Sequence, residues 1–202
     1  MADAIDSKSI DGNIMRVQVS LPAQMINIIF SSKDNKIEFE KAISEYNNIW
    51  KEDGKKIIES LEKISGLRFP IDTITITVYE GVSKSGSKTE PMMLRASYSL
   101  ETKKATIIHE LAHRLLDYNK IQTPTGWDTH QLLNLFLYDV WLNLYGKEFA
   151  IEQVNIEKKR NERYQKSWDW VLTMNSNDRA IKFSEVIGKS PSSKNNKLNI
   201  LN

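Results

Sequence analysis

The sequence predicts an α+β fold, because it contains both stretches patterned like β-strands and stretches patterned like α-helices. Alternating apolar side chains, the pattern of a half-buried strand, occur at residues 74–78 and 92–98. Apolar residues at helical spacing occur over 39–66 and again from about residue 102. With 202 residues, of which 40% are hydrophobic, the chain fits one globular domain with appendages.

The N-terminal part is predicted to contain a long helix and one or two strands. Residues 1–12 are expected to be flexible, and residues 15–21 alternate apolar and polar side chains as a half-buried strand does. Residues 25–30 fit either a second short strand or a helical turn. The pattern over 39–66 indicates one long helix, or two helices broken near Gly54, that end at Gly66.

The middle of the chain is predicted to hold two strands and a helix. Residues 74–78 alternate with threonines and form the first strand, and the polar residues 81–90 form a glycine-bearing loop. A second strand over 92–98 then leads into a helix over about 102–119.

A second long helix is expected after a loop. Asp128 and Gln131 are spaced as in a capping box, so this helix should begin there and run over about 129–145, stopped by Gly146. Because it is apolar nearly all round, it should be buried in the core.

The C-terminal part is predicted to add helices to the same domain. Helix is expected within 148–174, and a last short helix within 178–187. The predicted organisation is therefore a single domain over 13–187, with a helical extension from about residue 147. Residues 188–202 are rich in Ser, Asn and Lys and are expected to form a disordered tail.

Composition excludes several classes of protein. The formal charge of +2 gives no reason to expect a nucleic acid or an acidic membrane as partner. With no cysteine, the chain has no disulfide, no thiolate metal site and no cysteine nucleophile. The first 20 residues lack the pattern of a signal peptide, and no apolar run reaches the roughly 18 residues of a membrane span. We therefore expect a cytoplasmic protein without a membrane partner.

The most informative motif is H-E-x-x-H, which His109, Glu110 and His113 form within the helix predicted over 102–119. Positions i and i+4 of a helix lie one above the other on the same face. Two imidazoles so placed can bind one Zn²⁺, and the adjacent glutamate reaches the same side. The motif therefore predicts a catalytic zinc site.

A catalytic zinc usually has three protein ligands and one open position. His130, the third histidine of the chain, is the favoured third ligand, and Asp139 in the same helix is the alternative. Nine residues at 100° each place these two side chains about 180° apart, so only one of them can face the metal.

Other polar residues are candidates for supporting roles. Asn134 and Tyr138 form a polar stripe with His130 along one helix, and a metal site facing this stripe would satisfy it. Asp117 lies one turn beyond His113, where it either hydrogen-bonds a ligand imidazole or lies in solvent. Asp128 is most simply an N-cap, with contact to His130 as the alternative. Either Tyr138 or Tyr98 is a candidate oxyanion stabiliser, although each also fits a packed core aromatic.

These residues predict metal-assisted hydrolysis of a peptide bond or a related amide. Zn²⁺ lowers the pKa of water and polarises the carbonyl. Glu110 is expected to take the proton from water as general base and to pass it to the leaving amine. The expected substrate is a peptide or protein.

The motif and the order of elements around it resemble those of the zincin metallopeptidases. The zincin fold has a mixed sheet before the motif helix, and its edge strand binds extended substrate beside the zinc. Residues 74–78 and 92–98 stand where those strands would be, and residues 58–79 resemble small single-domain zincins of the minimal gluzincin and SprT-like kinds. Over about residues 40–145, the resemblance implies a small mixed sheet packed on the motif helix and on a buried following helix, with additional C-terminal helices.

The sequence departs from the established zincin subfamilies. It has no second Gly-x-x-His after the motif, as metzincins do, and its third ligand is a histidine rather than the gluzincin glutamate. SprT-like proteins use a third histidine at a somewhat shorter spacing, and no zinc ribbon is present here. The subfamily therefore stays open.

Two alternatives to a general peptidase stay open. One is a zincin-derived protein that binds metal or partners without turnover, although the presence of Glu110 argues against it. The other is a DNA-associated protease of the SprT-like type. Basic and aromatic residues over 158–168 suit nucleic acid, but interleaved glutamates indicate a solvated helix face, so we do not expect a nucleic-acid partner. The sequence does not give the oligomeric state.

Overall fold

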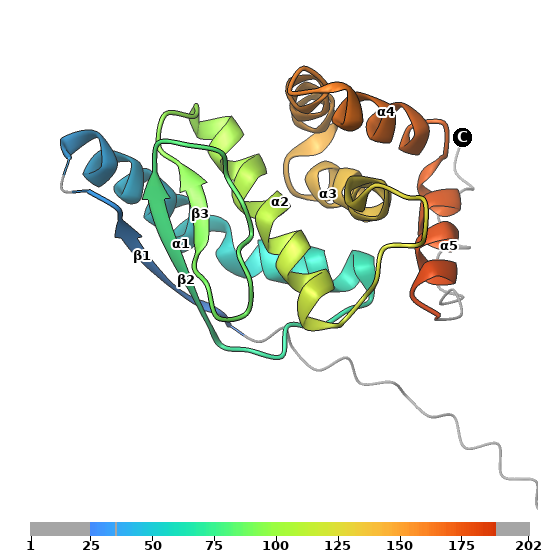
Figure 1. The fold of residues 1–202 in the computed structure, drawn as a ribbon, viewed down its shortest axis with the longest axis horizontal. Coiled ribbons are helices and arrows are strands. Elements are labelled where there is room, and N and C mark those ends of the chain that lie inside the picture. Colours follow the sequence, from blue (N-terminus) through green and yellow to red (C-terminus); the bar gives the residue numbers. More distant parts are fainter. Residues whose placement is uncertain (1–24, 35, 189–202) are drawn as a thin grey trace, which may run out of the picture.

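A computed structural model describes residues 25–34 and 36–188 of the chain. Three predicted segments lie outside the described residues. They are the flexible segment over 1–12, the strand over 15–21 and the tail over 188–202, of which only Gly188 is described. The fold is α+β, as predicted, with three strands and five helices among the described residues. Figure 1 shows the sheet on one side of the molecule and the C-terminal helices on the other.

The three strands form a parallel sheet in the order β1-β2-β3. They are β1 (Asn27–Ser32), β2 (Thr73–Tyr79) and β3 (Met92–Arg95). Pairing with β2 makes residues 27–32 a strand, which settles the choice left open for residues 25–30. Ile28 of β1 and Ile76 of β2 are buried in the core.

The prediction of a mixed sheet is wrong for the described residues, because both strand pairings are parallel. Among the described residues, only the loop before β3 pairs in the antiparallel sense. That loop is polar and contains two glycines, and it pairs with β3 through an isolated antiparallel bridge between Lys84 and Met93. Without alternating apolar side chains to bury, the loop does not extend into a strand.

Helix α1 (Ile37–Ser65) is continuous and ends at Gly66, which adopts a left-handed conformation with φ 68° and donates its N–H to the Glu62 carbonyl. Gly54 does not break the helix. Its Cα packs beneath the Trp50 ring, and a Cβ added there would lie 2.8 Å from that ring. Gly54 therefore provides room for an aromatic side chain.

The motif lies on α2 (Leu100–Tyr118), which packs against α1, β3 and α3 (Thr129–Lys158). Helix α3 begins with the predicted capping box. At Gly146, where the sequence predicts its end, the backbone turns sharply with φ 85° and ψ 177°, and helix then resumes to residue 158. Most of residues 132–141, before this kink, are buried as predicted, with Phe136 and Trp141 almost without exposure.

The described residues end with two short helices, α4 (Glu162–Val171) and α5 (Ser176–Val186), both of which pack on α3. Trp168 of α4 stacks on Trp141, and Phe183 of α5 packs against Phe136. These contacts extend the hydrophobic core from the sheet to the C-terminal helices. No helix of the described part of the chain has the length and hydropathy needed to cross a bilayer.

Candidate metal centre

Helix α2 aligns the first two histidines of the candidate site. The Ser99 hydroxyl caps the helix by accepting a hydrogen bond from the Thr102 N–H, and the helix then carries His109 and His113 one turn apart. Their Nε2 atoms lie 3.2 Å from each other. Two imidazole nitrogens bound to one tetrahedral zinc are expected about 3.3 Å apart, so this spacing suits a shared ion.

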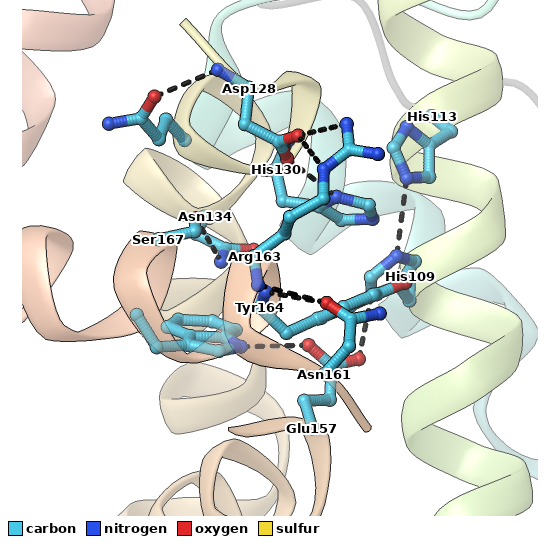
Figure 2. Close-up of polar contacts among 12 residues, drawn as sticks. His109, His113, Asp128, His130, Asn134, Glu157, Asn161, Arg163, Tyr164 and Ser167 are labelled. Carbon is cyan, nitrogen blue, oxygen red and sulfur yellow. Dashed lines mark hydrogen bonds and ion pairs between the residues drawn. The ribbon is translucent and has the colours of Figure 1, made fainter. Parts of the chain in front are cut away.

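The third histidine comes from the first turn of α3. The ring centroid of His130 lies 5.5 Å from that of His109 and 5.2 Å from that of His113. One nitrogen of each ring lies within 4.8 Å of the others. The three histidines therefore form a cluster that can bind a metal ion (Figure 2).

Two carboxylates determine which nitrogens face the centre of this cluster. The Nδ1 atom of His109 lies 2.8 Å from Glu157 Oε1, and the Nδ1 atom of His130 lies 2.9 Å from Asp128 Oδ1. Both rings therefore present Nε2 to the cluster. A carboxylate behind a ligand imidazole fixes its tautomer and orientation and raises its basicity.

Glu157 was not among the site residues expected from the sequence. Its side chain is 4% exposed and also accepts a hydrogen bond of 2.8 Å from Trp168 Nε1. A signal was present, since Glu157 follows Ala150 and Val154 on the apolar face of its helix. Only the packing of α3 after the Gly146 kink brings this face to His109, which lies 48 residues earlier in the chain.

Glu110 is buried beside the ligands, with 4% of its surface exposed. Burial raises its pKa from 4.5 to about 7, the nearby charge of His109 opposes the shift, and Glu157 reinforces it. A carboxyl group with a pKa near neutrality can both accept and return a proton at physiological pH. The near-neutral pKa of Glu110, which follows His109 in the chain, therefore suits a general base.

The histidines differ in their affinity for protons. Burial and the neighbouring His109 hold the pKa of His113 well below its usual value, and the same two causes lower the pKa of His130. Burial also disfavours the charged form of His109, but the charge and hydrogen bond of Glu157 outweigh it, so this pKa is raised. His113 and His130 are therefore neutral at pH 7, which is the form that binds metal.

Two further aromatic and basic side chains border the cluster. The Tyr164 ring of α4 lies 4.1 Å from the His130 ring and 6.2 Å from the His109 ring. The guanidinium of Arg160 lies over the rings of both Tyr98 and Tyr164, at 5.9 and 5.5 Å. Tyr98, a predicted candidate, is thus near the site, whereas Tyr164 and Arg160 were treated in the sequence analysis as a solvated helix face.

The alternative third ligand, Asp139, lies outside the cluster. Both of its carboxylate oxygens accept hydrogen bonds from Arg179 of α5, at 2.9 and 2.7 Å. Its expected position opposite His130 on the helix is the reason. With His130 facing α2, Asp139 faces α5, and the prediction of Asp139 as ligand is wrong.

Three of the other predicted candidates, Asn134, Tyr138 and Asp117, make no described contact with the histidines. Asn134 donates a hydrogen bond to Ser167 of α4, and the Tyr138 ring packs under Arg179. Eight residues turn a helix by about 80° beyond two full rotations, so Tyr138 is rotated away from the line of His130. Asp117 is exposed at the end of α2. Asp128 fulfils both expectations, as N-cap and as partner of His130.

Comparisons with protein-family models, with curated proteins and with solved structures gave no match. The function is therefore inferred from the site itself.

Proposed function

We propose that the protein is a zinc-dependent hydrolase, and specifically a metallopeptidase with His109, His113 and His130 as metal ligands. One observation carries the proposal: three imidazoles have nitrogens within 4.8 Å of one another, and the residue after His109 is a buried glutamate, Glu110, whose pKa is about 7. A purely structural metal site has no use for such a group.

The ligand set favours zinc. It consists of imidazole nitrogens, and the chain offers no thiolate because it contains no cysteine. Three protein ligands leave a fourth tetrahedral position open, as in hydrolytic zinc sites. The carboxylates of Glu157 and Asp128 behind two of the ligands agree with this assignment, since outer partners of this kind accompany catalytic zinc.

When bound, the metal lowers the pKa of water and polarises the scissile carbonyl. Glu110 would take the proton from the attacking water and return it to the leaving amine. Glu157 keeps the His109 ring fixed during these steps. The burial of Glu110 and Glu157 excludes competing water from this side of the site.

Arg160 and Tyr164 suit the stabilisation of the oxyanion, a role that the sequence analysis assigned to Tyr138 or Tyr98. Burial raises the pKa of Tyr164 to about 12, so its hydroxyl stays protonated and can donate a hydrogen bond. Glu157 and the two neighbouring tyrosines raise the pKa of Arg160 despite its burial, so the guanidinium stays charged. Both groups are donors beside the cluster of histidines.

The order of elements supports a zincin-like metallopeptidase of the small single-domain type. A sheet precedes the motif helix, and the following helix supplies the third ligand. We do not propose a nucleic-acid partner, because ion pairs with Asp169, Asp128 and Glu162 offset the charges of Lys158, Arg163 and Lys166.

One observation favours a second candidate, a zincin-derived protein that binds metal without turnover. The Tyr164 ring lies directly against His130, and His109 and Glu110 are almost completely buried, so access of a substrate to the cluster is restricted. The test below separates this candidate from a peptidase.

The first experiment measures metal content and the zinc dissociation constant of wild type, His130→Ala and Asp139→Ala. We expect one zinc per chain in the wild type, a loss of affinity of at least about 100-fold in His130→Ala, and an unchanged affinity in Asp139→Ala. The second compares cleavage of a complex peptide mixture by wild type and Glu110→Gln. Loss of a general base should reduce the rate by about 10²- to 10⁴-fold. Zinc binding with equal inertness of both proteins would favour the non-catalytic candidate.

A further inference from the structure

A chain of polar contacts connects the surface of α4 to the third metal ligand. Arg163 donates hydrogen bonds to Asp128 Oδ2 through Nε, at 2.9 Å, and through Nη2. The other oxygen of the same carboxylate, Oδ1, lies 2.9 Å from His130 Nδ1. Figure 2 shows Arg163, Asp128 and His130 in this order beside the two histidines of α2.

We infer that Asp128 and Arg163 are positioning residues that set the affinity of the site for metal by fixing the ring of His130. The inference rests on the metal-binding part of the proposed function and does not depend on hydrolysis. Neither residue contacts the centre of the cluster, so each acts through the imidazole.

His130 needs such support more than the other two ligands do. His109 and His113 lie in the middle of α2, where helix on both sides holds their backbone. His130 is the second residue of α3, and its side chain is 18% exposed. Helix ends fray, so the backbone alone holds this ring less firmly.

Asp128 serves two functions with one oxygen. Its Oδ1 atom accepts a hydrogen bond of 2.9 Å from the backbone N–H of His130 and also contacts the Nδ1 atom of the same residue. The first contact caps α3, and the second fixes the ring. A serine at this position would still cap the helix but would remove the carboxylate from the ring, so the two functions are separable by mutation.

Arg163 holds the carboxylate from its other side. The guanidinium binds Oδ2, which directs Oδ1 toward His130. The arginine side chain is 77% exposed, so its contribution to affinity should be small. Lys166 on the same helix is 74% exposed and pairs with Glu162, away from the histidines, which makes it a matched control.

The test measures zinc dissociation constants by competition with a chromophoric chelator, together with melting temperatures of the metal-free proteins. We expect Asp128→Ser to bind zinc about 10- to 100-fold more weakly while it melts close to the wild type. Asp128→Ala should lose the same affinity and also melt at a lower temperature, because the cap is lost. Arg163→Ala should bind about 2- to 5-fold more weakly, Arg163→Lys should recover part of this loss, and Lys166→Ala should bind as the wild type does.

Cobalt substitution gives a spectroscopic readout of geometry. If Asp128 positions the ring, the d–d absorption of the cobalt form of Asp128→Ser should shift, whereas that of Lys166→Ala should not. Wild-type zinc affinity and an unchanged cobalt spectrum in both Asp128→Ser and Arg163→Ala would overturn the inference and leave the proposed function intact. A wild type that binds no zinc would overturn both.

Discussion

At the scale of single residues, the site contains one carboxyl group with a raised pKa and two histidine rings that neighbouring carboxylates hold in place. Glu110 is a buried acid whose pKa is about 7 instead of 4.5, and burial is the main cause. In the metal-free protein, the raised pKa of Glu110 lowers the free energy of unfolding at high pH. Between these two values the folded chain binds a proton that the unfolded chain has released, so folding becomes less favourable as the pH rises.

Replacement of Glu110 by Gln should remove this pH dependence. At pH 8 the loss in wild type amounts to about 3 kcal/mol at most. Metal-free Glu110→Gln should therefore melt several degrees higher than wild type at pH 8, and the difference should shrink at pH 5, where both side chains are neutral. Melting curves in the presence of a chelator test this. An equal difference at both pH values would show that Glu110 does not titrate as described.

Glu157 offers a second test at the residue scale. Burial alone would raise its pKa, but His109, and then Arg160 and Trp168, hold it below its usual value, so the group is charged. Glu157→Gln removes the charge and places an amide where Trp168 donates a hydrogen bond and where His109 Nδ1 lies 2.8 Å from the carboxylate. Zinc affinity should fall about 10- to 100-fold.

The same variant should also unfold more readily, by about 1–3 kcal/mol, because a buried donor is left without a partner. Urea unfolding of the metal-free protein measures this. Glu162→Gln, which changes an exposed side chain of a surface ion pair, is the control and should alter neither quantity.

At the scale of elements, the kink of α3 decides whether Glu157 reaches His109. Gly146 has φ 85° and ψ 177°, a conformation that residues with a Cβ rarely adopt. The helix before the kink supplies His130, and the helix after it supplies Glu157. One glycine thus allows a single long element to contribute to the site twice.

Gly146→Ala should destabilise the protein by about 1–3 kcal/mol. A Cβ at this position would have no atom within 4 Å, so the expected cost is backbone strain and not a clash. It should also weaken zinc binding, because relaxation of the kink moves Glu157 relative to His109. Chemical unfolding and chelator competition measure the two effects, with Lys147→Ala on the exposed neighbour as control. Unchanged affinity despite lost stability would separate the kink from the site.

At the scale of the whole molecule, the candidate site joins elements that the sequence keeps far apart. Two ligands come from α2 and one from α3, while α4 contacts His130 through Tyr164 and through Arg163 with Asp128. The coupling between two events is reciprocal. If a contact of α4 strengthens metal binding, bound metal must stabilise that contact by the same free energy.

Zinc should therefore stabilise the fold and reduce the opening of α4. At 100 times the dissociation constant, a ligand that binds only the folded state contributes about 2.7 kcal/mol, so the melting temperature should rise by several degrees. Hydrogen exchange of the α4 amides should slow on addition of zinc, beyond the change in the first turns of α1, which lie outside the site. Equal effects on both helices would indicate global stabilisation without specific coupling.

The sequence by itself determined most of the helices and strands and the three histidines of the candidate site. Periodicity predicted a strand over 74–78, observed at 73–79, as well as the long helix that ends at Gly66 and the buried helix that begins at Asp128. These patterns depend on neighbours within one or two turns. The spacing of His109 and His113 predicted two ligand positions for the same reason, and His130 was the remaining histidine.

Only the tertiary structure decided the direction in which the rest of the site faces. Asp139 and Tyr138 face α5 instead of the histidines. Glu157, Arg160 and Tyr164 lie beside the histidines. The physical reason is that a local pattern fixes which side chains share a face, whereas the partner of that face depends on packing between distant segments. The kink at Gly146 and the docking of α4 both depend on such packing between distant segments.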